Sequence, residues 1–433
     1  MMYIVITLPH FFEGEADAVT LMFQSGLQRL HLRKPDSTID QCRQLLHDIP
    51  PVYHQRIVLH DHHQLVREFA VGGVHLNGRN PEPPVGWQGD VSRSCHTLQE
   101  VAEWKPRCTY VTLSPIFNSI SKQGYAAAFT PEQLMQAKAD GIIDHRVIAL
   151  GGICADNVAE ALQYGFGGVM VLGDAWTDPL SPRQKGTILT IAGSDSSAGA
   201  GIQQDLKTAT YCGCYATTVI TAITSQNTVG VQAIMPLPPH VVESQMRSIF
   251  SDIRVDAVKI GMIPNRDVAE AIVRVLREER TRRILPIVLD PVMISTSGTR
   301  LMADDCLQYI VSELFPLCTL ITPNIPENDH LAQYHCHGHN ILLKGGHATG
   351  SHVTDTLHLA AERRSVQYTS PRIETRNLHG TGCTLSSAIA SFMAQRQSLV
   401  TAVGNAKQVM DHFIRGGVTL SIGHGNGPMW MPR

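Results

Sequence analysis

The sequence predicts an α/β protein made of two successive units, and two observations carry that prediction. Short runs of β-branched or leucine-rich residues alternate with helical patterns through the first 175 or so residues. The same alternation begins again at Thr187, after a polar stretch. Repeated strand-then-helix units favour parallel sheets with helical crossovers. We find no repeat relation between the two halves.

The first unit is predicted to be a (β/α)8 TIM barrel. Seven apolar runs are each followed by a polar or Gly/Pro turn, and an eighth, weaker run lies at Asp90–Ser94. The seven stronger runs are Met2–Leu8, Arg29–Leu32, Arg56–Leu59, Gly73–Leu76, Tyr110–Leu113, Arg146–Leu150 and Gly168–Leu172. Eight strand–helix units suffice to close such a barrel, whose chemistry lies at the C-terminal ends of its strands.

The second unit is predicted to be a doubly wound α/β domain. The stretch Thr177–Gly186 holds two prolines and three charged residues, which is a linker composition. We place the barrel at residues 1–180, the linker at 181–186 and the second domain at 187–433. Beyond the strand that starts at Thr187, the expected strands are Ala257–Ile260, Pro286–Leu289, Leu320–Thr322 and Asn340–Leu343.

Composition narrows the class of protein. The formal net charge of −3 gives no sign of a nucleic-acid partner. No apolar run approaches the ~18 residues of a membrane span, and the N-terminus lacks the basic region and cleavage site of a signal peptide. The ten cysteines are scattered, without a C-x-x-C pair. Free thiols indicate a reducing compartment, so we expect a cytoplasmic protein that does not act at a membrane.

Polar residues follow several expected strands of the second unit. Asp290 ends a strand in VLDPVM, and Asn324 and Glu327 follow another in ITPNIPEN. Ligands bind at the carboxyl ends of strands in open α/β sheets. A carboxylate and an amide suit a hydrated Mg²⁺ that carries ATP phosphates. Lys344, at the end of a later strand, supplies a point charge for a phosphate.

Two glycine-rich turns add anion-binding capacity. The turn within Ile191–Asp205 follows a strand and opens a helix, and its backbone N–H groups can approach an anion. The second turn holds Gly380, Thr381 and Gly382 before another helix, whose N-terminus forms an anion hole. Cys383 lies in the first turn of that helix, where the dipole is expected to favour the thiolate. The sequence has no Walker-type phosphate loop.

At this point the second unit resembles hydroxymethylpyrimidine (phosphate) kinase, a member of the ribokinase-like fold. The resemblance covers almost all of residues 187–433. Seven motifs carry it, in order: GSDSSAGAGIQQDLKT, TAITSQNTVGVQ, SDIRVDAVKIGM, LDPVMISTSG, TPNIPEN, LLKGGH and HGTGCTLSSAIA. The resemblance implies that ATP phosphorylates hydroxymethylpyrimidine and then its monophosphate, with Mg²⁺.

The resemblance also implies residue roles. The pyrimidine pocket would be lined by Gly193, Asp205, Gln226, Met262 and Val292. Mg·ATP would be held by Asp290, Asn324, Glu327 and Lys344. Gly380, Thr381 and Gly382 would stabilise charge on the transferring phosphoryl group, with Cys383 as base or positioning group. A homodimer is implied by the family alone.

The sequence departs from the kinase pattern in two places. The first glycine-rich turn reads SSAGAG where the family more often has SSGGAG, and an extra methyl group is expected to be tolerated. The segment between Glu327 and Leu342 is shorter than expected by roughly one helix. The cluster HCHGH at His335–His339 lacks the spacing of a structural zinc site and is read as a solvated loop.

The first unit resembles the family that holds thiamin phosphate synthase and the thiazole tautomerase, both (β/α)8 barrels. The matching pieces are LHLRK, VLHD, GVHLNGRN, SRSCHT, SPIFNSISK, ALGGI and GVMVLG. A synthase would join pyrimidine pyrophosphate to thiazole phosphate, with Mg²⁺. The residues expected to meet phosphates or substrate are Arg33, Lys34, His96, Ser119, Ser121, Lys122, Gly152 and Gly173, and the expected metal ligand is Asp61.

Several positions depart from the synthase pattern. Asn80 stands where a second metal-binding aspartate is expected, which weakens a site for a hard cation. Gly173 replaces a serine of the phosphate loop, and Lys34-Pro35 moves a cation by one residue. A tautomerase tolerates these losses, with His96 as its base. Synthase, tautomerase and a non-catalytic binding barrel therefore stay open, as does a pyridoxal-type substrate for the kinase, although GTGC with SQNT favours the pyrimidine.

Overall fold

The computed structural model describes residues 1–118, 127–176, 186–293, 302, 304–334, 338–347 and 349–431. The chain divides into two compact units, one of Met1–Asp178 with Thr281–Ile284 and one of Pro179–Arg280 with Leu285–Arg433. The boundaries placed at 180 and 186 stay predictions, because residues 177–185 lie outside the described part. None of the described helices is long and apolar enough to cross a membrane.

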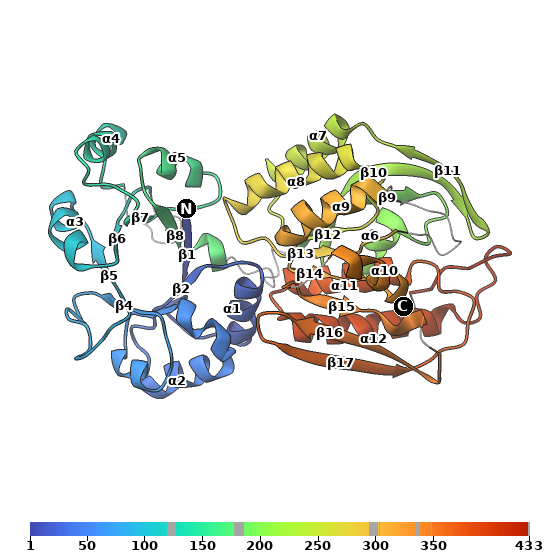
Figure 1. The fold of residues 1–433 in the computed structure, drawn as a ribbon, viewed down its shortest axis with the longest axis horizontal. Coiled ribbons are helices and arrows are strands. Elements are labelled where there is room, and N and C mark those ends of the chain that lie inside the picture. Colours follow the sequence, from blue (N-terminus) through green and yellow to red (C-terminus); the bar gives the residue numbers. More distant parts are fainter. Residues whose placement is uncertain are drawn as a thin grey trace. The chain divides into compact units, whose positions relative to one another are not determined.

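The first unit is a closed barrel of eight parallel strands in chain order, as predicted (Figure 1). The weak run at Asp90–Ser94 is its fifth strand. The strands are β1 (Met2–Ile6), β2 (Arg29–Leu32), β3 (Ile57–Leu59), β4 (Gly73–Leu76), β5 (Asp90–Cys95), β6 (Tyr110–Leu113), β7 (Val147–Leu150) and β8 (Gly168–Val171). The helices are α1 (Glu15–Gln24), α2 (Ile39–Asp48), α3 (Leu98–Trp104), α4 (Pro131–Ala139) and α5 (Val158–Gln163).

The interior of the barrel is divided between apolar and polar strands. Ile4 and Ile6 of β1 pack with Tyr110, Ile148 and Met170 in one buried cluster. Buried histidines lie on β2 and β4 and directly after β3, and they are described with the site. Apolar residues on the outer faces of the strands pack against the helices in the larger core cluster of this unit.

The second unit is a nine-stranded sheet in the order β11-β10-β9-β12-β13-β14-β15-β16-β17 (Figure 1). Its strands are β9 (Thr187–Asp195), β10 (Tyr215–Asn227), β11 (Gly230–Pro236), β12 (Ala257–Ile260), β13 (Ile287–Leu289), β14 (Leu320–Ile321), β15 (Ile341–Leu343), β16 (His352–Leu359) and β17 (Arg364–Pro371). Six neighbouring strands, β10, β9, β12, β13, β14 and β15, are parallel. Antiparallel strands add β11 at one edge and β16 and β17 at the other.

Helices of the second unit pack in two groups on this sheet. One group is α6 (Gly201–Tyr211), α11 (Thr381–Ala394) and α12 (Leu399–Gly417), and the other is α7 (Pro239–Phe250), α8 (Arg266–Arg280) and α9 (Asp304–Tyr309). The short helix α10 (Ile325–Leu331) follows β14. The carboxyl ends of the parallel strands meet at one edge, which brings together the polar residues that follow them.

Lys34 is part of the barrel's core, so the expectation that it faces a phosphate is wrong. Its Nζ lies 2.7 and 2.8 Å from the two carboxylate oxygens of Glu15 and donates to the His10 carbonyl at 2.7 Å. The Lys34 and Glu15 side chains are 0% and 3% exposed. The first turn of α1 places Glu15 under the end of β2, and a buried cation requires such a partner.

Lys34→Met is expected to destabilise the barrel by about 3 kcal/mol, because it leaves the Glu15 carboxyl buried without its partner. Three of the four tryptophans, Trp87, Trp104 and Trp176, belong to this unit, so their fluorescence in urea follows its unfolding. The matched control is Arg43→Met, which breaks an exposed pair with Glu68 and should cost less than about 1 kcal/mol. Equal losses in the two variants would contradict the assignment of Lys34 to the core.

Candidate active sites

A cavity of about 980 Å³ opens at the carboxyl ends of the second unit's parallel strands. Its lining includes all but one of the residues assigned to the kinase site from the sequence. These are Gly193, Gln226, Met262, Val292, Asp290, Asn324, Glu327, Lys344, Gly380, Thr381, Gly382 and Cys383. Residues spread over nearly 200 positions of the chain therefore meet in one place. The strand-end argument predicted this for Asp290, Asn324, Glu327 and Lys344.

Asp205 is the exception, and its assignment to the pyrimidine pocket is wrong. Its side chain is fully buried, and its carboxylate lies 2.8 and 3.0 Å from Lys259 Nζ. The hydroxyls of Thr190 and Ser387 donate to the same carboxylate. Asp205 lies on the inward face of α6, where it balances a buried cation. Lys259 itself lines the cavity, and although burial lowers its pKa, Asp205 raises it overall.

Charged groups gather where β13, β14 and β15 end. Lys344 Nζ lies 2.6 Å from Asp290 Oδ1 and 3.8 Å from Glu327 Oε2. Although burial lowers the pKa of Lys344, the two carboxylates raise it, so the side chain stays cationic. Burial, with Asp290 nearby, raises the pKa of Glu327 to about 7 against the opposing effect of Lys344. This end of the cavity therefore carries both signs of charge.

Asn324 and Glu327 also form the N-terminal cap of α10. The Asn324 side chain accepts a hydrogen bond from the Glu327 N–H at 2.8 Å, and the Glu327 carboxylate accepts one from the Asn324 N–H at 2.8 Å. Sequence reasoning treated the spacing of three only as a ligand pair, although an Asn-x-x-Glu spacing also matches a capping box. The cap fixes where both side chains stand.

The second glycine-rich turn fits against the first with no room for side chains. Gly380 caps α11 with a φ of 88°, and a Cβ added to it would lie 1.9 Å from the Gly199 carbonyl oxygen. A Cβ on Gly382 would lie 2.9 Å from Asp290 Oδ2. The first backbone N–H groups of a helix lack partners within the helix, although the Thr381 N–H donates to the Leu378 carbonyl at 3.3 Å. The turn therefore suits the predicted anion hole beside the carboxylate cluster.

Cys383 lines the cavity as a neutral thiol, and the expected thiolate is wrong. Burial, with Asp205 and Asp290 adding to it, raises the pKa of the thiol to about 11, even though Lys259 acts in the opposite direction. The helix N-terminus favours a thiolate. Two neighbouring carboxylates and the loss of solvent outweigh that effect.

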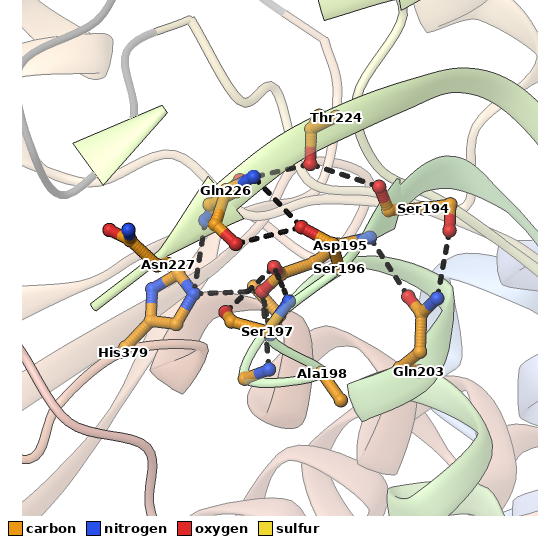
Figure 2. Close-up of polar contacts among 12 residues, drawn as sticks. Ser194, Asp195, Ser196, Ser197, Ala198, Gln203, Thr224, Gln226, Asn227 and His379 are labelled. Atoms are coloured by element: carbon orange, nitrogen blue, oxygen red, sulfur yellow. Dashed lines mark hydrogen bonds and ion pairs between the residues drawn. The ribbon is translucent and has the colours of Figure 1, made fainter. Parts of the chain in front are cut away.

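Sequence reasoning gave no role to Asp195 and His379, which lie inside the quoted motifs. The Asp195 carboxylate accepts hydrogen bonds from the N–H groups of Ser197, Gly199 and Ala200, and it lies 2.9 Å from His379 Nε2 (Figure 2). It therefore ties the first glycine-rich turn to the segment that leads into the second. The aspartate at the end of β9 and the histidine that opens the HGTG motif were the available signals.

The barrel's candidate residues fall into two sets. Ser119, Ser121 and Lys122 lie outside the described residues. Gly152 has a φ of 67°, and a Cβ there would lie 2.3 Å from the Asn118 carbonyl oxygen, so the β7 loop approaches the β6 loop closely. Arg33 and Gly173 follow β2 and β8, at the same end of the barrel.

His96 follows β5 and is exposed. Its Nδ1 lies 3.2 Å from the Ser114 carbonyl oxygen, and donation to that oxygen leaves Nε2 as the basic nitrogen. Its backbone N–H donates to Glu100 at 2.6 Å. The basic nitrogen is thus accessible to solvent, which suits the predicted role of His96 as a base.

Asp61 has one oxygen available for a cation. Oδ1 accepts two hydrogen bonds from Arg79, at 2.8 and 3.0 Å. Oδ2 is buried and accepts none from any residue that the structure describes. The Asn80 amide donates to the His60 carbonyl at 3.0 Å, so this amide supports the loop after β3. An unpartnered buried carboxylate oxygen fits a hard divalent cation, although it is a single anionic ligand.

A buried histidine cluster in the barrel was not predicted. One ring nitrogen from each of His31, His60 and His75 lies within 4.8 Å of the others. His31 contacts His60 at 2.7 Å and Tyr110 at 2.6 Å, and both nitrogens of His75 contact serine hydroxyls at 2.8 Å. The rings of His60 and His75 stack 18° from parallel, so their lone pairs do not converge. We interpret the cluster as a hydrogen-bonded polar core.

Comparison with known proteins decides the family. A family model described as phosphomethylpyrimidine kinase matches residues 195–430, and one described as thiamine monophosphate synthase matches residues 3–174. A thiamine biosynthesis bifunctional protein of Geobacter sulfurreducens is 35% identical over 86% of this chain and 81% of its own length. The chain belongs to this bifunctional thiamin-biosynthesis family. Its halves are a synthase-type barrel and a pyrimidine kinase of ribokinase-like fold.

Two further relatives match the kinase half alone. A hydroxymethylpyrimidine/phosphomethylpyrimidine kinase of Rhizobium meliloti is 42% identical over 56% of this chain and 95% of its own length. The solved structure of an ADP complex of Bacillus subtilis pyridoxal kinase is 29% identical and covers 56% of this chain and 96% of the pyridoxal kinase, with a TM-score of 0.51.

Cys383 is expected to react with iodoacetamide slowly at neutral pH, since a thiol with a pKa of about 11 is almost wholly protonated there. Its rate should rise about tenfold per pH unit up to about pH 10, measured on the Cys383 peptide by mass spectrometry. Cys212, whose pKa burial raises to about 12, serves as the internal comparison. A rate that levels off below pH 8 would contradict the neutral thiol and support the thiolate that the sequence predicted.

Proposed function

We propose that the chain phosphorylates the pyrimidine half of thiamin and joins it to the thiazole half. The kinase unit transfers phosphoryl groups from ATP to hydroxymethylpyrimidine and to its monophosphate. The barrel then joins the pyrimidine pyrophosphate to thiazole phosphate. The observation that carries the kinase proposal is the single cavity in which the anion hole, the carboxylate cluster and the predicted pyrimidine residues meet. A homodimer and a cytoplasmic location stay predictions.

Phosphoryl transfer is mainly a matter of placement and charge. The backbone N–H groups of Gly380 and Gly382, on either side of Thr381, would stabilise the charge on the transferring group, with the cations of Lys344 and Lys259 behind them. Asp290, Asn324 and Glu327 would hold Mg²⁺, whose chemistry is to neutralise phosphate charge. Their oxygen donors fit a hard cation. The pKa of Glu327 is raised because its charged form is buried near Asp290, and a bound cation would stabilise that charged form.

Cys383 would act as a positioning thiol rather than as a thiolate base. A neutral thiol at the start of α11 can donate a weak hydrogen bond to an oxygen held in the anion hole. Lys259 lies close enough to affect the Cys383 pKa, so the thiol and this buried cation share one end of the cavity. The carboxylate of Asp205 keeps Lys259 in place beneath them.

The barrel supports synthase chemistry through the free Oδ2 of Asp61 and the close loops at Gly152. A thiazole tautomerase is the second candidate. The orientation of His96 favours it, because a base with Nε2 in solvent reach is what proton transfer on a thiazole needs. The Asn80 amide, which is held by the His60 carbonyl, would not replace a second metal-binding carboxylate.

The purified chain with Mg·ATP, hydroxymethylpyrimidine and thiazole phosphate is expected to form thiamin phosphate. This product is measured by its fluorescence after oxidation. Asp61→Asn should abolish this product while ATP consumption continues, because it removes the barrel's only candidate metal carboxylate among the described residues. Accumulation of pyrimidine pyrophosphate by the unaltered chain would support the kinase and contradict the synthase. The barrel would then be tested on the non-aromatic thiazole tautomer.

Cys383→Ala is expected to lower the kcat of phosphoryl transfer by about two orders of magnitude, as loss of one donor in an anion hole does elsewhere. Pyrimidine binding, measured by calorimetry without ATP, should hardly change. Cys212→Ala is the matched control, since Cys212 lies at the end of α6 away from the cavity lining. Unchanged turnover in Cys383→Ala would remove the thiol from the mechanism.

A further inference from the structure

The lining of the kinase cavity follows the order of the strands in the sheet. Residues assigned to the pyrimidine, such as Gly193 and Met262, belong to β9 and to the segment after β12, and the carboxylate cluster follows β13, β14 and β15. Further lining comes from β16, β17 and α12, on the far side of β15. In phosphoryl transfer the acceptor and the leaving group lie on opposite sides of the transferred group. The nucleoside of ATP would therefore lie over β16, β17 and α12.

One face of α12 forms the wall at this end of the cavity. Lys407, Met410, Asp411 and Ile414 are spaced by three and four residues, so they share one side of the helix, and all four line the cavity. The helix packs against β17 (Figure 1). Two of the four side chains are apolar and two are charged, so this wall offers both an apolar surface and hydrogen-bonding groups.

Lys407 is a buried cation with donors left over. Its Nζ lies 2.7 Å from Asp355 Oδ2, and the Lys407 and Asp355 side chains are 7% and 4% exposed. Among the residues that the structure describes, Asp355 is the only hydrogen-bond partner of this ammonium. An ammonium has three N–H donors, and buried donors are normally paired. The remaining N–H groups are therefore available to a ligand in the cavity that Lys407 lines.

Asp355 places this cation close to the phosphate-binding groups. Its Oδ1 accepts a hydrogen bond from the Gly345 N–H at 2.7 Å, and Gly345 directly follows Lys344. The Lys344 N–H in turn donates to the Pro323 carbonyl at 2.9 Å. One carboxylate thus links Lys407 to the turn that carries Lys344, so Lys407 lies near the end of the nucleoside that joins the phosphates.

Asp411 supplies an acceptor beside this donor. Its Oδ1 accepts a hydrogen bond from the Ser370 hydroxyl at 3.3 Å, and its Oδ2 accepts none from any residue in the described part of the chain. Burial raises the pKa of Asp411 against the opposing effect of Lys407, and Asp355 raises it further, so the three charges lie close together. In this group of three the carboxylates outnumber the ammonium, which suits a neutral ligand group better than a phosphate.

We propose that Lys407 and Asp411 bind the ribose 2′- and 3′-hydroxyls of the nucleotide and so make the kinase selective for ribonucleotides. Lys407 Nζ donates to the oxygen of one hydroxyl, and Asp411 Oδ2 accepts from the O–H of the other. A vicinal diol offers an acceptor and a donor side by side, which is what this pair requires. Met410, Ile414 and Val353 are left for the flat face of the base. The inference rests on the proposed kinase function and deepens it.

The amino edge of adenine also offers a donor beside an acceptor. The ribose is favoured because Asp355 ties Lys407 to the turn of Lys344, and the ribose is the part of a nucleoside that lies next to the phosphates. The two alternatives are separated by nucleotides that are altered at only one of these groups.

The test compares kcat/KM for ATP, 2′-deoxy-ATP and 3′-deoxy-ATP in the whole chain, with hydroxymethylpyrimidine as the acceptor. The unaltered enzyme should prefer ATP over each deoxy analogue by at least about tenfold, since one hydrogen bond to a charged group is lost. In Asp411→Leu the preference over at least one analogue should fall below about threefold, through a higher KM for ATP. The KM for the pyrimidine should stay unchanged, because the lost contact holds only the nucleoside.

Two further variants separate this role from a structural one. Gln408→Leu is the matched control, because Gln408 is exposed on the same helix and outside the cavity lining, and it should leave every ratio unchanged. Lys407→Met should also lower the preference for ATP, although it leaves the Asp355 carboxylate buried without its partner and can cost stability. Asp411→Leu carries the test if Lys407→Met does not fold, since Asp411 is only partly buried.

An unaltered preference for ATP over both deoxy analogues in Asp411→Leu, with the parent enzyme active, would overturn the inference and leave the kinase proposal standing. A parent enzyme that uses ATP and both deoxy analogues equally well would do the same. If Asp411→Leu instead lost a preference for ATP over inosine triphosphate, with the deoxy ratios unchanged, the pair would bind the base and the inference would be wrong. A parent chain that phosphorylates the pyrimidine with none of these nucleotides would refute the kinase proposal, and the inference with it.

Discussion

The close contact between two glycine-rich turns is the constraint on which the kinase site depends. A Cβ on Gly380 would lie 1.9 Å from the Gly199 carbonyl oxygen, and one on Gly199 would lie 2.3 Å from the His379 ring. Backbone meets backbone because side chains are missing at both positions. The predicted anion hole and the hydrogen bonds of Asp195 both lie at this approach, although the turns are about 180 residues apart in the chain.

Much of this site follows from the sequence because strand ends are easy to recognise. Asp290 and Lys344 each follow a short apolar run, and in a parallel sheet such positions meet at one edge. The eighth barrel strand, β5, was recognised only as a weaker run, because two of its six residues are buried. The antiparallel edge strands β11, β16 and β17 were not predicted. Their residues are largely exposed or partly exposed, so they lack the continuous apolar run of a buried parallel strand.

The wrong assignments of Asp205, Lys34 and Cys383 share a cause, because a sequence motif does not show which residues its side chains contact. In the sequence alone, Asp205 and Lys34 look like charges that face a ligand. In the structure, each is buried against an opposite charge from another element. The Cys383 thiolate was inferred from the helix N-terminus alone, whereas burial, with the carboxylates of Asp205 on α6 and Asp290 after β13, raises the pKa of the thiol. Charge balance in a folded core depends on contacts between segments that local patterns do not contain.

The histidines inside the barrel set an acid limit on this unit. Burial lowers the pKa of His31 and His60 well below 6.5 and that of His75 to about 3. Below about pH 6.5 these histidines therefore bind protons in the unfolded chain, whereas in the folded barrel they stay neutral to a lower pH. Folding stability is full above that pH and falls below it, by as much as about 4 kcal/mol per pH unit if all three rings take part. Mild acid would thus destabilise the barrel through residues at its centre.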